Sequence, residues 1–240
     1  MFAVIFEVQP KKERWDDYLN MAKLLKPEVE NIDGFIDNER YASKRQEGRI
    51  LSLSTWRDEK AVIRWRTLAV HHQAQEKGRF EIFEDYHLRV GEIVADTAPP
   101  EGQAMREQRF DETEVGSARA VTISELPAKD GTPASADLAA DLGLAKVGTS
   151  GLLDHELFES IYNPGKLLLL AAWIDAAAAE RCKPKAIAGV ALRHRRVRVI
   201  RDYGMFERRE APQYYPPVES KATRAQTSEA RERAAHRRPG

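Results

Sequence analysis

The 240-residue chain is long enough for two domains of about 100 residues each, and its 38 basic residues balance its 38 acidic ones. Equal numbers exclude a global charge that would attract nucleic acid or an acidic membrane, so neither partner is expected. A single cysteine, Cys182, excludes an internal disulfide and a cysteine-based zinc site. No apolar run approaches about 18 residues and no signal pattern opens the chain, so we expect a soluble, cytoplasmic protein.

Residues 1–95 show the pattern of one small α+β domain. Apolar and β-branched runs predict strands, and apolar residues at helical spacing predict helices. The predicted elements are a strand over Phe2–Val8, a helix over Lys11–Leu25, a hairpin of Gly34–Ser43 and Arg49–Trp56, a helical stretch from Asp58 to Gly78 and a strand over Phe80–Val94. A break of the helical stretch near Val70 stays open. Pro27 is expected to follow the end of the first helix, and Asp58 to cap the second. The order β-α-β-β-α-β is the split βαβ pattern of ferredoxin-like domains.

The second half of the chain repeats the first at an offset of 117 positions, as from Trp56 to Trp173. About 18 identities share this offset, too many for chance, which indicates a tandem duplication. The repeat predicts a strand over Ala118–Leu126, a helix over Ser135–Leu144, a hairpin of Leu152–Ser160 and Lys166–Trp173, a short helix from Asp175 to Cys182 and a strand over Arg193–Phe206. The second copy therefore has the same order of elements.

The repeat divides the chain into two domains, a linker and a tail. Residues 1–95 form the first domain, and residues 118–209 form the second, degenerate repeat. Residues 96–117 are rich in Pro, Glu, Gln and Asp and are predicted to form an exposed linker. Residues 210–240 are predicted to form a flexible basic tail, with a nucleic-acid-binding arm over Arg231–Arg238 as the alternative.

Several short stretches of the first domain carry a recognisable pattern. They are Gly34-Phe35, the strand-to-helix junction Ser54–Ala61, Trp65 followed by His71–Gln75 and Gly78-Arg79, and Asp85–Val90. In these residues the domain resembles the antibiotic biosynthesis monooxygenases of the dimeric α+β barrel superfamily. The resemblance implies an α+β fold in which two tandem ferredoxin-like (βαββαβ) repeats form a dimeric α+β barrel within one chain. An intramolecular pseudo-dimer is the simplest inference, and a homodimer of two chains stays open.

The resemblance also implies a monooxygenase that acts on a small aromatic or quinol-like substrate and O2. Such a substrate donates its own electrons to oxygen, so no cofactor is expected. In this hypothesis Trp65 and Phe6 shape the pocket, His72 accepts the substrate proton and Arg79 holds the developing oxyanion. His72 follows Trp65 by seven positions, which is two turns on one face if the helix is continuous.

His71 and Tyr86 complete the set of candidate substrate-binding residues. Adjacent residues on a helix point about 100° apart, so His71 and His72 cannot share a metal ion, and no metal site is expected. The structural alternative places Trp65 in the core and His72 on the surface at a helix end. Tyr86 recurs as Tyr203 in the second repeat, which favours a packing role for both tyrosines.

Two other functions stay open. Haem-degrading relatives resemble this chain in having a Trp followed by a His ligand on this helical segment, so haem is the alternative cofactor. Those relatives also carry an Asn on the first strand, which Phe2–Val8 lacks. The other alternative is a non-catalytic barrel that binds a small ligand. Because Cys182 and Gly189 stand in the second repeat where the first has Trp65 and His72, any chemistry is expected in the first repeat.

Overall fold

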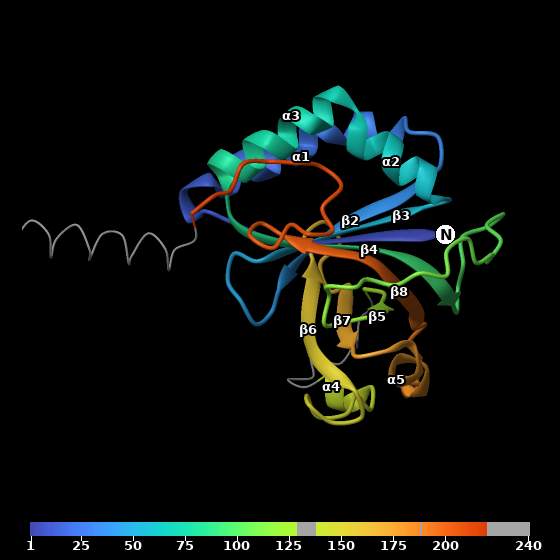
Figure 1. The fold of residues 1–240 in the computed structure, drawn as a ribbon. Coiled ribbons are helices and arrows are strands. Elements are labelled where there is room, and N and C mark those ends of the chain that lie inside the picture. The colour runs from blue at the N-terminus through green and yellow to red at the C-terminus, as the bar shows by residue number, and fades with distance from the viewer. Residues whose placement is uncertain (129–137, 188, 220–240) are drawn as a thin grey trace, which may run out of the picture.

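The computed structural model describes residues 1–128, 138–187 and 189–219 (Figure 1). The strands are β1 Phe2–Pro10, β2 Phe35–Ser43, β3 Ile50–Trp56, β4 Phe83–Asp96, β5 Ala120–Leu126, β6 Leu152–Ser160, β7 Leu167–Trp173 and β8 Arg193–Gly204. The helices are α1 Trp15–Glu30, α2 Glu59–Thr67, α3 Ala69–Lys77, α4 Leu138–Asp141 and α5 Ala176–Arg181, with a 3-10 turn at Lys12–Arg14 and a π turn at Gly78–Ile82. Within these ranges no helix is long and apolar enough to cross a lipid bilayer.

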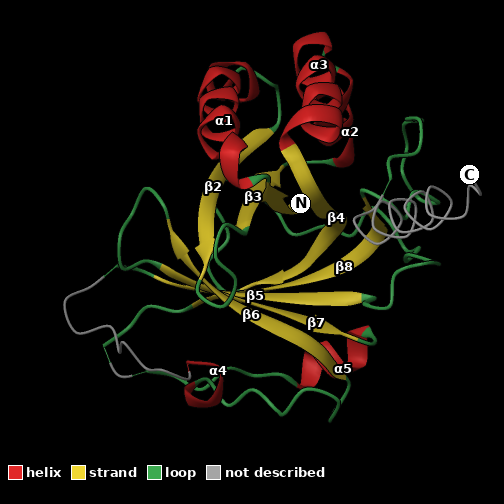
Figure 2. Cartoon of the chain, turned by 90° about the vertical axis from the view of Figure 1, so that its left-hand side faces the viewer, coloured by secondary structure: helices red, strands yellow, loops and turns green. Residues whose placement is uncertain are grey.

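The strands form one closed antiparallel barrel in the order β1-β3-β2-β6-β7-β5-β8-β4. Each unit contributes four neighbouring strands, and the pairs β2–β6 and β4–β8 join the units at the two seams. Helices α1, α2 and α3 lie over the outer face of the first unit, while α4 and α5 lie on the opposite side of the barrel (Figures 1 and 2). The predicted fold, two ferredoxin-like units forming an α+β barrel within one chain, is confirmed.

Alternation along the strands divides the side chains between the barrel interior and the helix layer. On β1, Ala3 and Ile5 point inward and join a hydrophobic cluster with residues of both units, among them Phe158 and Val197. Phe2, which precedes Ala3 on the strand, packs outward under the helices. Burying each large apolar side chain contributes about 1.5–3 kcal/mol. Because both units fill one interior, neither unit has a complete core alone.

Polar contacts at the β2–β6 seam are reciprocal. The Ser43 hydroxyl donates to Glu156, and the equivalent Ser160 hydroxyl donates to Glu39. All four residues lie 117 positions from their counterparts, as the repeat predicts. The seam therefore has the approximate two-fold symmetry of a dimer interface, here made within one chain.

Ion pairs between the first and last strand of each unit show which residues correspond. Glu7 on β1 binds Arg89 on β4 at 2.8 Å, and Glu125 on β5 binds Arg195 on β8 at 2.5 Å. In both units the arginine lies opposite the strand position two residues before the glutamate. Arg195 therefore corresponds to Arg89, although it follows Arg89 by 106 positions and not by 117.

The constant offset of 117 predicted for the repeat is thus wrong for the last strand, and it is one residue too small for the first strand, where Phe2 and Ala120 lie opposite the two tryptophans. It matched Tyr86 with Tyr203, but Tyr203 pairs across the seam with Leu88, so the two tyrosines do not occupy equivalent positions. The second unit is 11 residues shorter between its hairpin and its last strand. Its described residues there contain α5 but no counterpart of α3. The shortening removes the segment that, in the first unit, carries both histidines.

Helix α1 is longer than predicted. It continues through Pro27 and ends at Glu30, although proline lacks the N–H that a helix uses at that position. Val29 in the last turn is buried beside Phe2 and Trp56. Burial of this turn outweighs the single hydrogen bond that Pro27 removes. Asp58 caps α2 as predicted, and the π turn at Gly78–Ile82 delays the start of β4 by three residues relative to the prediction.

Most residues of the segment between β4 and β5 are exposed, but several of them contact the barrel. Thr113 is fully buried, and the Glu92 carboxylate accepts the backbone N–H groups of Gln108 and Arg109. Arg109 also forms an ion pair with Glu59 at the start of α2. These contacts tie the connecting segment to the first unit.

The chain after β8 crosses in front of α1 and α3, as the orange-red segment of Figure 1 shows. Arg79 is 2% exposed and donates to the carbonyls of Met205 and Pro216, so it holds this segment. The predicted flexible tail and the arm over Arg231–Arg238 fall mainly in 220–240, outside the described residues. Residues 135–137 of the predicted helix Ser135–Leu144 are likewise outside them, and α4 covers only Leu138–Asp141 of it.

Candidate functional site

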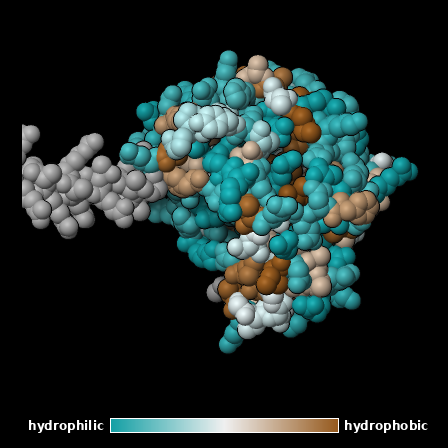
Figure 3. All heavy atoms as spheres, viewed as in Figure 1, coloured by the Kyte–Doolittle hydropathy of each residue, from teal (hydrophilic) through white to brown (hydrophobic). Residues whose placement is uncertain are grey.

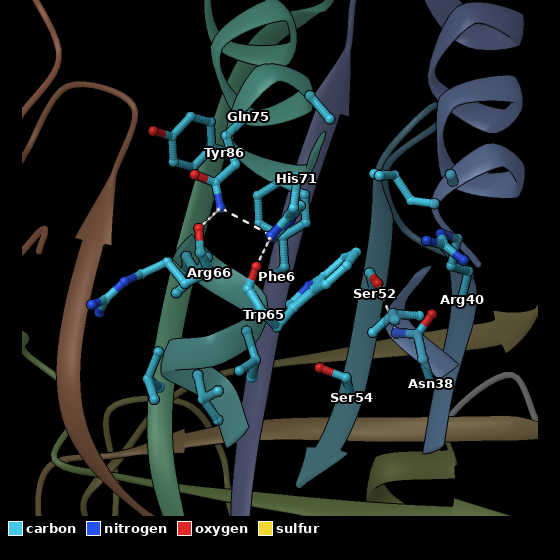
Figure 4. A pocket seen from close by; sticks show the side chains of 18 of the residues that line it. Phe6, Asn38, Arg40, Ser52, Ser54, Trp65, Arg66, His71, Gln75 and Tyr86 are labelled. Atoms are coloured by element: carbon cyan, nitrogen blue, oxygen red, sulfur yellow. Dashed lines mark hydrogen bonds between the residues drawn. The ribbon is translucent and has the colours of Figure 1, made fainter. Parts of the chain in front are cut away.

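A cavity of about 890 Å³ lies between the outer face of β1–β4 and helices α1, α2 and α3. This volume is within the usual range for small-molecule sites. Its apolar walls include Val4, Phe6, Phe35, Trp56, Val62, Trp65 and Leu88. Its polar lining includes Asn38, Arg40, Ser52, Ser54, His71, Gln75 and Tyr86 (Figure 4). The arrangement is that of a ligand site with apolar walls and a few polar groups.

A break between α2 and α3 decides which histidine reaches the cavity. Leu68 adopts an extended conformation, with φ −61° and ψ 129°, between the end of α2 and the start of α3. The Thr67 hydroxyl bonds the Ile63 carbonyl at 2.9 Å in the last turn of α2, a contact that competes with helix continuation. The break changes the helical phase, so His71 stacks on Trp65 with ring centroids 3.9 Å apart.

His71 is held as a neutral imidazole. Its Nδ1 lies 2.9 Å from the Trp65 carbonyl oxygen, which only accepts, so Nδ1 carries the proton and donates it. The Gln75 amide nitrogen, itself a donor, lies 3.2 Å from the same Nδ1 and donates to the Arg66 carbonyl at 3.4 Å. Burial lowers the pKa of His71 to about 4. At neutral pH the Nε2 atom therefore keeps a free lone pair.

The structure brings four of the six predicted site residues together. Phe6, Trp65, His71 and Tyr86 all line the cavity. His72, predicted as the base, is exposed, does not line the cavity and lies against Tyr215, whose hydroxyl is 3.2 Å from its Nδ1. The continuous helix assumed in the prediction is the reason for the difference.

Arg79, the sixth predicted residue, also lies outside the cavity lining. Its guanidinium donates to the Tyr86 hydroxyl at 3.2 Å and to the Met205 carbonyl at 2.6 Å. Arg208 donates to the same hydroxyl at 2.7 Å and to the Gln213 carbonyl at 2.9 Å. The Tyr86 ring therefore lines the cavity, while its hydroxyl is occupied in fixing the segment after β8.

The sequence prediction missed the polar residues of the hairpin. Asn38 on β2 donates to the Ser52 hydroxyl oxygen at 3.1 Å, and the Trp56 indole donates to that of Ser54 at 2.8 Å. Each serine accepts one hydrogen bond and keeps its own proton available to donate. The alternation of β2 and β3, which puts Arg40 and Ser54 on the same outer face as Trp56, is the sequence signal that identifies them.

The mouth of the cavity is partly formed by the second unit. Tyr203 on β8 and Pro212, Gln213 and Tyr215 after it belong to the lining. The Gln213 side-chain amide lies 3.4 Å from the Arg66 carbonyl, and Tyr215 reaches Gln75 at 3.3 Å. The site is therefore complete only when both units and the described part of the C-terminal segment are in place.

The closed barrel and the cavity under α1, α2 and α3 define a dimeric α+β barrel protein with a small-molecule pocket. A crystal structure of an aldoxime dehydratase has this fold: it superposes with a TM-score of 0.51 at 11% identity, covering 83% of this chain and 81% of that one. A crystal structure of an antibiotic biosynthesis monooxygenase matches 41% of this chain and 100% of its own, with a TM-score of 0.35 and 15% identity.

Sequence comparison identifies the family. The model for antibiotic biosynthesis monooxygenases matches residues 1–77. A protein of Pyricularia oryzae named Jasmonate monooxygenase ABM is 46% identical over 222 residues, which cover 91% of this chain and 100% of that protein. The chain belongs to the antibiotic biosynthesis monooxygenase family, and the resemblance inferred from the sequence is confirmed.

Proposed function

We propose that the protein is a monooxygenase that binds a small, largely apolar substrate in the cavity between β1–β4 and α1–α3. The observation that carries the proposal is His71, a buried neutral imidazole stacked on Trp65 at the cavity wall. A group of this kind accepts a proton from a substrate C–H or O–H. His71 takes the role that the sequence prediction gave to His72.

The remaining roles follow from the lining. Trp65 and Phe6 form walls that hold the substrate and exclude water. The hydroxyls of Ser52 and Ser54 donate to the oxygen on which negative charge develops, the role predicted for Arg79. Arg79 instead acts on the site indirectly, because it holds the segment that forms the cavity mouth.

The first candidate substrate class is aromatic or quinol-like. Loss of a proton to His71 leaves a carbanion or phenolate that is able to reduce O2 directly. Oxidation of a ring CH2 to C=O balances O2 without any other reductant, since one oxygen atom enters the substrate and the other leaves as water. This class requires no cofactor.

The second candidate class comes from the relative named as a jasmonate monooxygenase. Jasmonate is a cyclopentanone carboxylic acid with an apolar side chain, which suits the apolar walls. Hydroxylation of such a C–H bond uses O2, two electrons and two protons, so an external two-electron donor is required. The need for a reductant therefore separates the two classes.

An oxygen electrode tests the proposal. We expect the purified protein to consume O2 either with an anthrone or quinol alone, or with jasmonic acid when a reductant is added. Mass spectrometry with ¹⁸O2 is expected to find one labelled atom in the product. Absence of label from every substrate of both classes refutes the monooxygenase.

Haem binding is the second candidate function, and the chain's residues are compatible with it. His71 offers a neutral nitrogen, Nε2, beside an apolar cavity, which is what a haem iron takes from a proximal histidine. Bound there, haem would supply oxygen activation. A saturable Soret shift with hemin that is lost in His71→Ala supports this candidate, and no specific shift removes it. The non-catalytic barrel is less well supported, because the lining contains an ionisable histidine.

A further inference from the structure

Arg40 on β2 is a partly buried guanidinium on the wall of the cavity. Its Nε is shielded from solvent and has no hydrogen-bond partner, and no carboxylate among the described residues forms an ion pair with it. Other arginines of the same barrel are paired, as Arg49 and Arg89 are with Glu7 at 2.5 and 2.8 Å. A charge taken out of water without a partner is costly, so its presence at a ligand cavity points to a ligand of opposite charge.

The neighbours of Arg40 do not neutralise it. Glu39 precedes it on the strand, so its side chain faces the opposite side of the sheet and binds Lys166 and Ser160. Tyr18 lies next to Arg40, but burial raises the pKa of its hydroxyl even against the positive charge, so the phenol stays neutral. The positive charge of Arg40 therefore remains available to a bound anion.

We propose that Arg40 binds the carboxylate of the substrate, and that the substrate is a monocarboxylic acid with an apolar body. A guanidinium matches a carboxylate with two parallel hydrogen bonds. Figure 4 shows Arg40 on β2 and His71 on α3, with Trp65 between them in the view. With its carboxylate on Arg40, the acid extends its apolar body along Trp65 toward His71. This inference rests on the monooxygenase function and names its substrate class.

Jasmonic acid and its methyl ester form a matched pair of probes, because esterification removes the charge and keeps the apolar body. We expect wild-type protein to bind the acid about 10- to 100-fold more tightly than the ester in calorimetric titrations at neutral pH. Arg40→Met keeps a long side chain and is expected to abolish this preference by weakening the acid alone. Arg40→Lys keeps the charge but not the two-bond geometry and is expected to retain part of the preference.

Arg64→Met is the control, because Arg64 on α2 does not line the cavity and forms an ion pair with Asp33 at 3.3 Å. This variant is expected to keep the wild-type preference. Equal binding of acid and ester to the wild type, or an unchanged preference in Arg40→Met, overturns the role of Arg40. Thermal unfolding of each variant checks that it is folded.

Turnover separates this inference from the proposed function. Oxygen uptake with jasmonic acid that is undiminished in Arg40→Met refutes the anchor but keeps the monooxygenase. If the acid binds in an Arg40-dependent way but the wild type takes up no oxygen with it, Arg40 is still the carboxylate-binding residue. Oxygenation of that acid is then refuted. If neither probe binds the wild type, the inference of an apolar monocarboxylate of this size is refuted.

Discussion

In the first unit, helices of 16, 9 and 9 residues stand over the sheet and enclose the cavity, whereas in the described part of the second unit α4 and α5 have four and six residues. Figure 3 shows hydrophobic atoms gathered at the bottom of the view, over the second unit. Both units nevertheless contribute equally placed strands to one barrel interior. The comparison teaches that the inward-facing side chains of both units are constrained, because the two units share one core. The helices on the outer faces are not part of that core and can differ between the units.

The outer sheet faces differ in the same way. Phe6 on β1 lines the cavity, and by strand register its counterpart is Ser124 on β5. Leu88 on β4 also lines the cavity, and its counterpart His194 on β8 lies with Nδ1 2.9 Å from the Ser124 hydroxyl. The second unit thus pairs these polar groups with each other, where the first presents apolar walls to a ligand.

The largest expected effect concerns the histidines of α3, which the second unit lacks. His71→Gln removes the proposed base and is expected to lower kcat/KM about 10²- to 10⁴-fold, the usual contribution of general base catalysis. His72→Gln is the matched control one residue away, outside the cavity, and is expected to stay within twofold of the wild type. The measurement is oxygen uptake under saturating and limiting substrate. Equal losses in both variants would show that the break at Leu68 does not select His71.

The second prediction tests the shared interior through its two equivalent glutamates. Glu125→Gln is expected to lower the free energy of unfolding by about 3 kcal/mol, because it leaves Arg195, which is 1% exposed, without its charged partner. Burial raises the pKa of Glu125, but Arg195 and the hydrogen bond from Tyr41 outweigh this and hold that pKa below its ordinary value. The carboxylate is therefore charged in the folded state.

Glu7→Gln is the matched variant in the first unit, and its effect is expected to be smaller. Its partner Arg49 is 28% exposed, and its other partner Arg89 keeps a contact to Asp202 at 3.3 Å. Urea unfolding of both variants gives the comparison. A larger loss of unfolding free energy in Glu7→Gln than in Glu125→Gln would contradict the expectation that the ion pair of the second unit is the more strongly buried of the two.

The third prediction transfers a residue from the second unit to the first. Trp65 follows the helix cap Asp58 by seven positions, as Cys182 follows Asp175, and this stretch keeps the offset of 117. Trp65→Cys removes the ring on which His71 stacks and is expected to raise KM about tenfold, with a smaller change in kcat. Cys182→Trp is expected to create no activity in the second unit. An unchanged KM in Trp65→Cys would exclude Trp65 as a wall of the binding site.

The smallest effect is the pH dependence of stability. Burial lowers the pKa of His71 to about 4, below its ordinary value of about 6.5, so between these values the unfolded chain binds the extra proton. The free energy of unfolding should therefore fall as the pH is lowered from 6.5 toward 4, by about 1 kcal/mol between pH 6.5 and 5.5. His71→Gln is expected to remove this increment in urea titrations, and His72→Gln to keep it. The same slope in all three proteins would contradict the burial of a neutral His71.

Much of the fold was predictable because the signals that define it are local. The alternation in Arg49–Trp56, the capping Asp58 and the repeated tryptophans identify the strands, the helix start and the duplication without any tertiary information. The same approach failed at Pro27, where burial of the following turn outweighs a lost hydrogen bond, and at Tyr203, where an ungapped match conceals a deletion. The first error arises because packing outweighs a local rule, and the second because only the strand pairing reveals which residues are equivalent after a deletion.

The candidate site was predictable in its walls and not in its chemistry. Sequence pattern and resemblance alone determined the barrel, and they named Phe6, Trp65, His71 and Tyr86, which line the cavity, as candidate substrate-binding residues. Only the tertiary structure decided that His71 and not His72 stacks on Trp65, that Arg79 holds the C-terminal segment, and that Arg40 lies at the cavity without a carboxylate. The physical reason is that the break between α2 and α3 sets which side chains of α3 face the cavity, and the packing of distant segments sets which groups an arginine can bind. The spacing of residues along the chain contains neither kind of information.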